Sequence, residues 1–426
     1  MENEISVLSL NCWGLYLIAS KRKVRLQAIA ELLESSEYDI VALQEVWLQE
    51  DFDMIRTKTS IKLPFAKYFY SGALGSGLAT LSKYPIIESS YQCYKLAGRP
   101  LKILHGDYYV GKGCGSVCVE HPEIGILEIF NTHLHARYGT SQEYESHLIS
   151  EAWELARLLR ASSSQRRQVI LAGDLNSTTT SYVYQIITKH GFVTDSWEEA
   201  YSRTSAPPID TPDPNSTSTT IRLYNDGVTC NSPFNTWSRN FNKPYTGEIM
   251  GKRLDYILYL SGSRLACIDS QVSVTEYIPK TNTSYSDHFG VHSTFHILPE
   301  TSSPIKVTHP CTTKLSATTI HEILTLLTKQ QAKTQRTVRI LLIVFVTMVI
   351  LSLVMYGFLV GLSVGYSQIF LVTTLVPIFC GGGLLFCAAL APILLIVGFV
   401  FGNTEQRAHR QFVDDLEVLL LSFKNN

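Results

Sequence analysis

Over its first 298 residues the chain alternates between short apolar runs and polar turns. Each run has roughly four to eight residues, which favours buried β-strands over helices. The predicted strands are 5–10, 39–46, 77–83, 116–120, 125–132, 169–173, 254–260 and 291–298. A turn at His121-Pro122-Glu123 separates two of them. We therefore expect 116–120 and 125–132 to pair as a hairpin.

Helical periodicity occurs between some of these strands. Residues 24–33 place apolar side chains near one face, namely Val24, Ala28, Leu32 and Leu33. Residues 146–160 do the same with Ile149, Ala152, Ala156 and Leu159. A shorter helix is predicted over 180–190, and residues 204–218 read as a surface loop rich in Pro, Ser, Thr and Asp. Because hairpins are mixed with alternating strands and helices, we infer an α/β fold of two packed sheets flanked by helices.

The C-terminal part has a different pattern. No charged residue occurs between Arg339 and Glu405. A helix crosses the hydrocarbon in about 20 residues, so this stretch suits two crossings, 340–362 and 369–401. Gly365-Tyr366-Ser367-Gln368 is the predicted turn. The predicted organisation is an α/β domain (1–298), a linker and juxtamembrane helix (299–338), a two-span hairpin (339–402) and an amphipathic tail (403–426). A buried hairpin of a soluble domain is disfavoured, because so long an uncharged run is rare there.

Charge patterning bears on location and partners. Basic residues flank both outer ends of the hairpin and none lies in its turn: Lys329, Lys333, Arg336, Arg339, Arg407, His409 and Arg410. The positive-inside tendency then places both ends, with the first domain, in the cytosol. The acidic N-terminus does not read as a signal peptide. Nine cysteines without CxxC spacing indicate free thiols. With 36 Lys+Arg against 37 Asp+Glu, no overall charge favours nucleic acid.

Polar residues stand repeatedly at the ends of the predicted strands. Asp174 and Asn176 follow the strand 169–173, and alternation along an extended chain would turn both to one side. Other strand ends carry Asn11, Glu45, His133, Asp255, Asp287 and His288. Each alone could be a surface acid or a structural histidine. A buried, unpaired Asp is costly, so their coincidence indicates a shared site that holds a cation or a strong donor.

Five motifs, in this order, resemble those of the endonuclease/exonuclease/phosphatase superfamily, which has the DNase I-like fold. They are Leu43-Gln44-Glu45, Asn131-Thr132-His133, Gly173-Asp174-Leu175-Asn176, Leu254-Asp255-Tyr256 and Ser286-Asp287-His288. The resemblance implies a four-layer α/β sandwich of two mixed sheets. It also implies Mg²⁺ held by Glu45 with help from Asn11, and Asp287 near the metal.

The same resemblance implies the other roles. Asp174 and Asn176 would position the attacking water and the phosphoryl oxygens, and His288, oriented by Asp255, would be the general base. His133 would donate to the phosphate as charge develops. The chemistry needs these groups, since a hard cation neutralises an anionic phosphodiester and an imidazole near its working pKa accepts a proton from water. No nucleophilic Ser or Cys is required, so we predict direct attack by water.

Further stretches resemble the neutral sphingomyelinase branch of this superfamily. They include 131–138, the helix segment Glu151-Ala152-Trp153-Glu154, and 71–78. In 106–113, Asp107 and Lys112 match an Asp and a Lys, five positions apart, that contribute to catalysis in that branch. A catalytic domain followed by two membrane helices also agrees. The implied substrate is a membrane phospholipid, sphingomyelin or a lyso-phosphocholine lipid, cleaved to release phosphocholine, and the implied location is the endoplasmic reticulum. Candidate aromatic partners for the choline are Tyr108, Tyr109, Tyr138 and Trp237.

Three other functions are weighed. A membrane-tethered nuclease would need a basic groove, for which Arg99, Lys102 and Lys112 are too sparse. An inositol polyphosphate phosphatase would have an Arg where this chain has Ser177. A non-catalytic membrane scaffold is disfavoured because every expected catalytic position is filled. Preference between sphingomyelin and lyso-phosphocholine lipids, and the oligomeric state, do not follow from the sequence.

Overall fold

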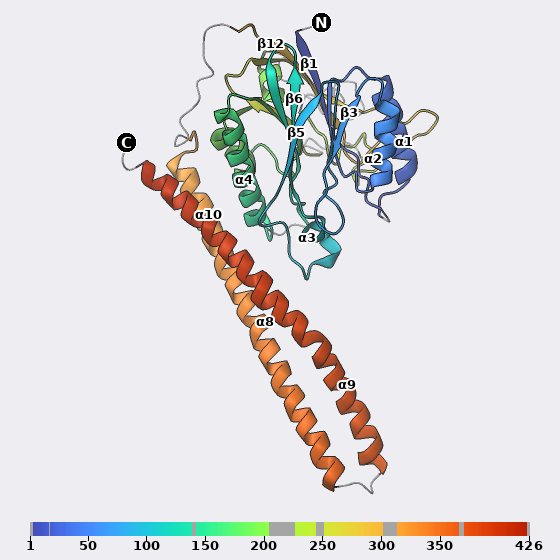
Figure 1. Cartoon of the computed structure of the whole chain (residues 1–426), viewed down its shortest axis with the longest axis vertical. Helices are drawn as coiled ribbons and strands as arrows, with labels where there is room; N and C mark the ends of the chain where they lie inside the picture. Colours follow the sequence, from blue (N-terminus) through green and yellow to red (C-terminus); the bar gives the residue numbers. More distant parts are fainter. Residues whose placement is uncertain are drawn as a thin grey trace. The chain divides into compact units, whose positions relative to one another are not determined.

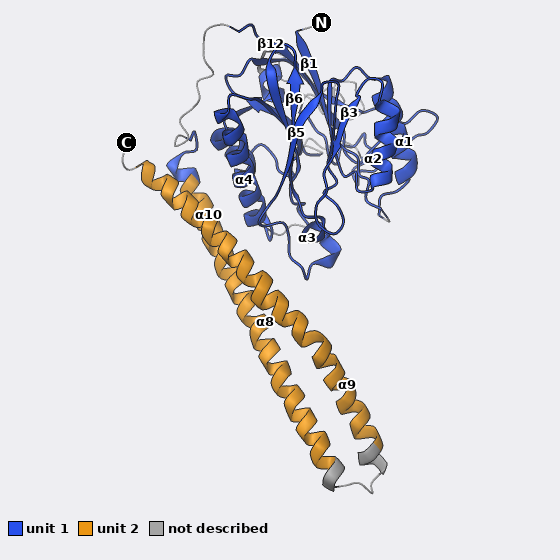
Figure 2. Cartoon of the chain, in the orientation of Figure 1, with its two compact units in different colours: residues 1–319 blue, residues 320–426 orange. Residues whose placement is uncertain are grey.

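The computed structural model describes residues 3–16, 18–138, 142–203, 226–243, 251–300, 313–365 and 370–423. The chain divides into two compact units, residues 1–319 and 320–426 (Figure 2). The predicted loop over 204–218 and the turn residues 366–368 lie outside the described residues.

The first unit contains two six-stranded mixed sheets. One has the order β11 (Leu265–Ser273), β12 (Gly290–Ile297), β1 (Glu4–Asn11), β2 (Ile40–Gln44), β4 (Ala79–Ser82) and β3 (Phe65–Tyr68). The other has the order β5 (Ile86–Cys93), β6 (Gly113–His121), β7 (Gly125–His133), β8 (Gln168–Asp174), β10 (Asp255–Leu260) and β9 (Val193–Asp195). The predicted hairpin is confirmed, because β6 and β7 pair antiparallel.

Helices cover the outer faces of the sheets (Figure 1). The first sheet packs against α1 (Arg22–Ser35) and α2 (Gln49–Thr59), and the second against α4 (Glu145–Ser164). Shorter elements complete the unit: η1 (Ile103–His105), α3 (Asp107–Val110), α5 (Tyr182–Gln185), η2 (Ile186–His190) and α6 (Ser196–Arg203). The predicted fold class, two mixed sheets flanked by helices, is confirmed.

Strands buried on both faces explain the continuous apolar runs. In β1, Ile5 and Val7 face the second sheet, while Leu8 and Leu10 face the helices. The same division occurs in β2, where Ile40 belongs to the core between the sheets. The sequence therefore shows runs rather than alternation wherever a strand separates two apolar layers.

The face predicted for α1 is wrong in one respect. Val24 is 54% exposed, whereas Leu26 and Ile29 are fully buried. The buried stripe also contains Arg25, whose charge hides the periodicity in the sequence. The helix predicted over 146–160 is confirmed, because Ile149, Ala152, Ala156 and Leu159 are all buried in α4.

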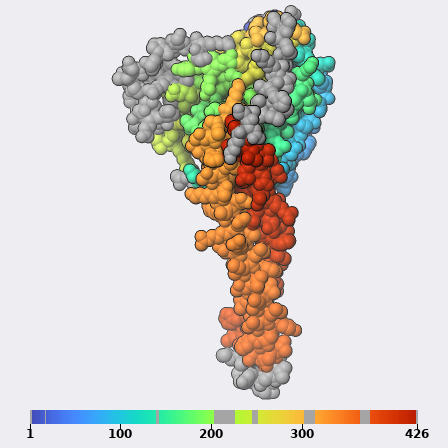
Figure 3. Space-filling view, turned by 90° about the vertical axis from the view of Figure 1, so that its left-hand side faces the viewer, coloured from blue at the N-terminus to red at the C-terminus, as the bar shows by residue number. Residues whose placement is uncertain are grey.

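The second unit consists of long helices. They are α8 (Ala317–Gly365), α9 (Phe370–Leu395), the π-helical segment η3 (Ile396–Phe401) and α10 (Gly402–Ser422). Figures 1 and 3 show α8 and α10 side by side, and Thr334 donates to Glu405 across them at 3.2 Å. By length and composition this unit holds two candidate membrane spans, one in 317–362 and one in 374–422. No break separates the expected juxtamembrane helix from the first span.

Candidate active site

The candidate site lies where the faces between the two sheets turn polar. Alternation along each strand extends the apolar face by two residues at a time. After Ile5 and Val7 the same face of β1 reaches Asn11, and after Ile170 and Ala172 the same face of β8 reaches Asp174. His133 ends β7 in the same way, and Asp255 begins β10 two residues before Ile257. The core between the sheets thus ends in a cluster of polar side chains.

Strand register places these groups side by side in the second sheet. His133 is opposite Asp174 in the parallel pair β7–β8, and Asp174 is opposite Asp255 in the antiparallel pair β8–β10. The close pairing of β7 with β8 depends on Gly173, because a Cβ there would lie 2.1 Å from the carbonyl oxygen of Thr132. Backbone packing next to the site therefore requires a glycine at this position.

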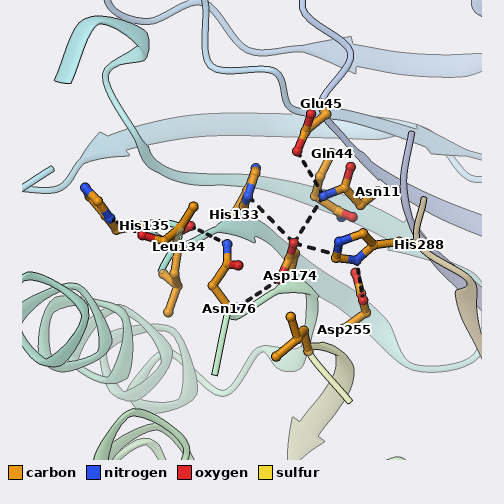
Figure 4. Close-up of polar contacts among 12 residues, drawn as sticks. Asn11, Gln44, Glu45, His133, Leu134, His135, Asp174, Asn176, Asp255 and His288 are labelled. Carbon is orange, nitrogen blue, oxygen red and sulfur yellow. Dashed lines mark hydrogen bonds and ion pairs between the residues drawn. The ribbon is translucent and has the colours of Figure 1, made fainter. Parts of the chain in front are cut away.

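Asn11 joins the two sheets at the site. Its amide nitrogen donates to Glu45 Oε1 at 3.2 Å and to Asp174 Oδ2 at 3.1 Å (Figure 4). Its amide oxygen accepts from the backbone N–H of Trp13 at 3.0 Å, which fixes the orientation of the side chain. In this orientation Asn11 holds two carboxylates and keeps its oxygen away from them. The geometry favours a positioning role for Asn11 over direct ligation of a metal.

Asn176 reaches the site by a different route from the one predicted. Strand β8 ends at Asp174, and Asn176 lies beyond it with a φ of 46°. Strand alternation therefore does not bring the two side chains together. Instead the backbone N–H of Asn176 donates to Asp174 Oδ1 at 2.8 Å, and its side-chain amide donates to the carbonyl of Leu134 at 3.0 Å.

A histidine and two carboxylates form the most compact part of the site. His288 Nδ1 lies 2.8 Å from Asp255 Oδ2 and 3.9 Å from Asp174 Oδ2. His133 Nε2 lies 3.7 Å from Asp174 Oδ2 on the other side (Figure 4). With Nδ1 of His288 committed to Asp255, Nε2 is the ring nitrogen left to exchange a proton with another molecule.

Burial and mutual repulsion raise the pKa values of the acids in the site. Burial, and then the charge of Asp255, raises the pKa of Asp174 to about 7. Burial, and then the charge of Asp287, raises the pKa of Glu45, and burial with the charge of Asp255 raises that of Asp287. Loss of hydration on burial is the main cause of these shifts, and the negative charge of the neighbouring acids adds to it.

The pKa values of the two histidines in the site shift in opposite directions. Burial disfavours the charged form of His288, but nearby Cys230 and the carboxylates of Asp255 and Asp174 outweigh it and raise its pKa well above the usual value. Burial, with the charge of Lys112, lowers the pKa of His133 well below its usual value. Burial therefore favours the neutral form of His133, whereas the carboxylates beside His288 favour its protonated form.

This cluster can hold a metal ion. The ligand atoms of Asp174, Asp255 and His288 lie within 4.8 Å of one another, a different set from Glu45, Asn11 and Asp287. Asp255 Oδ1 is buried and has no hydrogen-bond partner among the described residues. Oxygen-rich donor sets of this kind suit hard divalent cations. The donor chemistry at this end of the sheets therefore fits a Mg²⁺-type ion.

Asp107 and Lys112 form a second buried group beside the first. Lys112 Nζ lies 2.9 Å from Asp107 Oδ1 and donates to the carbonyl of Leu134 at 2.7 Å. Tyr138 donates to Asp107 Oδ2 at 2.6 Å. Burial alone would raise the pKa of Asp107, but Lys112 and His135 lower it overall. Because Leu134 follows His133 directly, this ion pair is attached to the end of β7.

The other candidate aromatics have structural contacts. Tyr109 donates to the carbonyl of Pro100 at 2.6 Å, and Trp237 donates to the carbonyl of Ser284 at 2.8 Å. The Tyr108 ring packs edge-on against Tyr109.

Two supporting groups were not predicted. Gln44 donates to Asn131 Oδ1 at 2.8 Å, which links the sheets below the site. Arg25 is fully buried and donates at 2.6–3.0 Å to the backbone carbonyls of Ser20, Cys12, Tyr285 and Trp13. It thereby joins the chain after β1 to the segment that carries Asp287 and His288. Its position between apolar residues of the α1 stripe is the sequence signal for it.

The comparison with known protein families identifies the class of the chain. Residues 8–288 match the model of the endonuclease/exonuclease/phosphatase family, and the chain belongs to this family. The matched range contains all of the candidate site residues. The resemblance predicted from the five motifs is confirmed.

Within that family the chain is similar to enzymes named for phosphosphingolipids. It is 41% identical over 297 residues to inositol phosphosphingolipids phospholipase C of Schizosaccharomyces pombe, covering 69% of each chain. It is 31% identical over 297 residues to human sphingomyelin phosphodiesterase 2, covering 69% of this chain and 64% of the relative. The chain thus spans about two thirds of the length of these relatives.

A solved structure agrees with the fold. The crystal structure of TDP2 from Caenorhabditis elegans matches with a TM-score of 0.50 and 18% identity, covering 69% of this chain and 75% of that one. At this identity the match supports the fold alone.

Proposed function

We propose that the chain is a divalent-cation-dependent phosphodiesterase that hydrolyses phosphosphingolipids in the manner of a phospholipase C. Water would attack the phosphorus, and ceramide would leave with its oxygen while the phosphorylated headgroup is released. The single observation that carries the proposal is the convergence of Glu45, Asp174 and His288 at one end of the two sheets, bridged by Asn11.

A bound Mg²⁺ would neutralise charge on the phosphodiester and stabilise the leaving alkoxide. Glu45 and Asp287 are the ligands we propose for it, because Asp174 and Asp255 already have the imidazole of His288 as a counter-charge. Glu45 and Asp287 are also partly exposed, which leaves them accessible to a cation and a headgroup. Asn11 would hold Glu45 in place rather than bind the ion itself.

The protein's own groups supply the proton transfer. Asp255 holds Nδ1 of His288, so that Nε2 can accept the proton of the attacking water. A cation held by Glu45 and Asp287 would oppose protonation of His288 and would favour its neutral, basic form. Asp174, fixed by Asn11 and by the backbone of Asn176, would orient the water. His133, whose neutral form is favoured by burial, can donate an N–H to a phosphoryl oxygen, with the charge of Lys112 nearby.

Two headgroups are candidates. Sphingomyelin was predicted from the sequence, and Tyr138 lies close to the site through its bond to Asp107. The 41% identity to inositol phosphosphingolipids phospholipase C favours a phosphoinositol headgroup instead. Both lipids have the same ceramide–phosphate bond, so the proposed chemistry is common to them. The two candidate membrane spans support a substrate that lies in a membrane. A cytosolic orientation remains our proposal from the flanking basic residues.

Hydrolysis by the full-length protein in detergent micelles with Mg²⁺ tests the proposal. The substrates are labelled sphingomyelin, inositol phosphosphingolipid, lyso-phosphatidylcholine and DNA. We expect one or both phosphosphingolipids to be cleaved, and His288→Ala to lower the rate by about 10³-fold or more. His296→Ala is the matched control, because His296 lies at the end of β12 opposite Glu4, away from the site. Cleavage of DNA alone would favour the nuclease alternative, and no cleavage at all would favour the scaffold.

A further inference from the structure

A short connection next to the candidate site directs apolar side chains into solvent. It follows β5 and includes η1 and the start of α3. Leu101 is 51% exposed, Ile103 67% and Leu104 98%. Three large aliphatic groups within four residues form an unusual exposed patch, because isolated apolar residues are common at a protein surface but clusters mark a contact surface.

The surrounding charges indicate what this patch contacts. No acidic residue occurs between Ser89 and Gly106, whereas Lys95, Arg99 and Lys102 are basic. Arg99 and Lys102 both approach Glu143, at 2.9 and 3.7 Å, and Lys102 remains 46% exposed. Exposed apolar side chains beside basic residues are complementary to a phospholipid surface, where phosphates overlie acyl chains.

The segment that carries Leu101, Ile103 and Leu104 is connected directly to the candidate site. The ring of His105 stacks on Tyr138 with centroids 4.0 Å apart, and the carbonyl of His105 accepts a hydrogen bond from the Tyr138 hydroxyl. The same hydroxyl shares its proton with Asp107 Oδ2, 2.6 Å away, and Asp107 pairs with Lys112. Figure 1 shows α3 at one end of the first unit, and β1 runs from the N-terminus towards that end. The apolar residues and the catalytic candidates therefore share one end of the unit.

We propose that residues 99–106 form a lipid-inserting segment that seats the first unit on a phospholipid bilayer. Leu101, Ile103 and Leu104 enter the acyl layer, and the basic residues meet the phosphates. The segment then delivers the headgroup of a lipid, still in its bilayer, to the site beside Asp107. This delivery rests on the proposed function, whereas the insertion itself does not.

Photo-crosslinking tests the insertion without any need for catalysis. The full-length protein is reconstituted in phosphatidylcholine vesicles that contain a diazirine-bearing phosphatidylcholine, irradiated, and mapped by mass spectrometry. We expect adducts on 101–104 and none at Ile61, an apolar residue that is 92% exposed beyond α2. Leu101→Ser/Ile103→Ser/Leu104→Ser should lower the yield at this segment by about tenfold. Adducts confined to 317–362 and 374–422, or cross-links from the segment to protein alone, would overturn the proposal.

A comparison of substrate forms tests the delivery. The triple serine variant should hydrolyse phosphosphingolipid in vesicles about tenfold more slowly than wild type, but dispersed short-chain substrate within about twofold. Ile61→Ser should match wild type on both. An equal fall on both substrates, or no fall on vesicles, would refute delivery by this segment. A wild type that cleaves neither substrate would contradict the proposed function, and the cross-linking result would still decide the insertion.

Discussion

Asp255→Asn is the substitution that most sharply separates a general-base histidine from a merely structural one. Asp255 is buried, its Oδ2 lies 2.8 Å from His288 Nδ1, and its other oxygen has no partner among the described residues. Asparagine preserves the shape and removes the charge. It can also donate its amide hydrogen to Nδ1, which would leave the imidazole proton on Nε2 and block the base.

The expected magnitude follows from this contact. A hydrogen bond to a charged group contributes about 1.5–3 kcal/mol, which corresponds to a fall in kcat of about 10- to 150-fold. Where the tautomer is inverted, the loss extends to about 10⁴-fold, as in serine-protease triads. KM should change little, since Asp255 lies behind His288 rather than against the lipid.

The pH profile gives a second, independent signature. Burial lowers the pKa of His288, whereas Cys230, Asp255 and Asp174 together raise it above its ordinary value. A general base acts in its neutral form, so activity should rise with pH through this pKa. Loss of the Asp255 charge removes one raising influence, and the rising limb should therefore move to lower pH.

The assay is steady-state hydrolysis of phosphosphingolipid in mixed micelles from pH 5 to pH 9 with saturating Mg²⁺. Asp269→Asn, an exposed change on β11, is the matched control and should behave as wild type. If Asp255→Asn kept kcat within about twofold and left the pH profile unshifted, the assignment of His288 as general base would be refuted.

Three further results are expected. Mg²⁺ should raise the melting temperature more at pH 8 than at pH 5, because the pKa of Glu45 is raised and that of Asp174 is raised to about 7, so that stability without the ion falls as pH rises. Equal shifts in thermal scans would contradict this. Arg25→Met should lower stability by about 3 kcal/mol or more in denaturant titrations, because buried carbonyls lose their donors, and a near-neutral result would disprove that role. Gly173→Ala should abolish activity and lower the melting temperature, because its Cβ would collide with Thr132; a fully active variant would show that β7 can move.

The sequence allowed the fold class to be predicted and the candidate site residues to be placed at the ends of predicted strands. Asn11, His133, Asp174 and Asp255 could be placed because each stands at one end of an apolar run that predicts a buried strand. Convergence of these groups followed from the order of the motifs. Their roles stay predictions until the variants are measured.

What could not be predicted depended on features without periodicity. The edge strand β5, with the sequence IIESSYQC, is largely exposed on both faces and so has no apolar run. The orientation of Asn11 depends on a backbone N–H of Trp13, and the position of Asn176 depends on a left-handed residue after the strand. The exposure of Leu104 could not be predicted, because an apolar residue in a turn usually reads as core.

The most direct test of the central claim is a Mg²⁺ titration of phosphosphingolipid hydrolysis after chelation of the full-length protein. We predict no turnover without a divalent cation, saturable recovery with Mg²⁺, and a half-saturating concentration at least about tenfold higher for Glu45→Gln. Full turnover after chelation, or an unchanged half-saturating concentration in Glu45→Gln, would contradict a cation-dependent centre at the end of these two sheets.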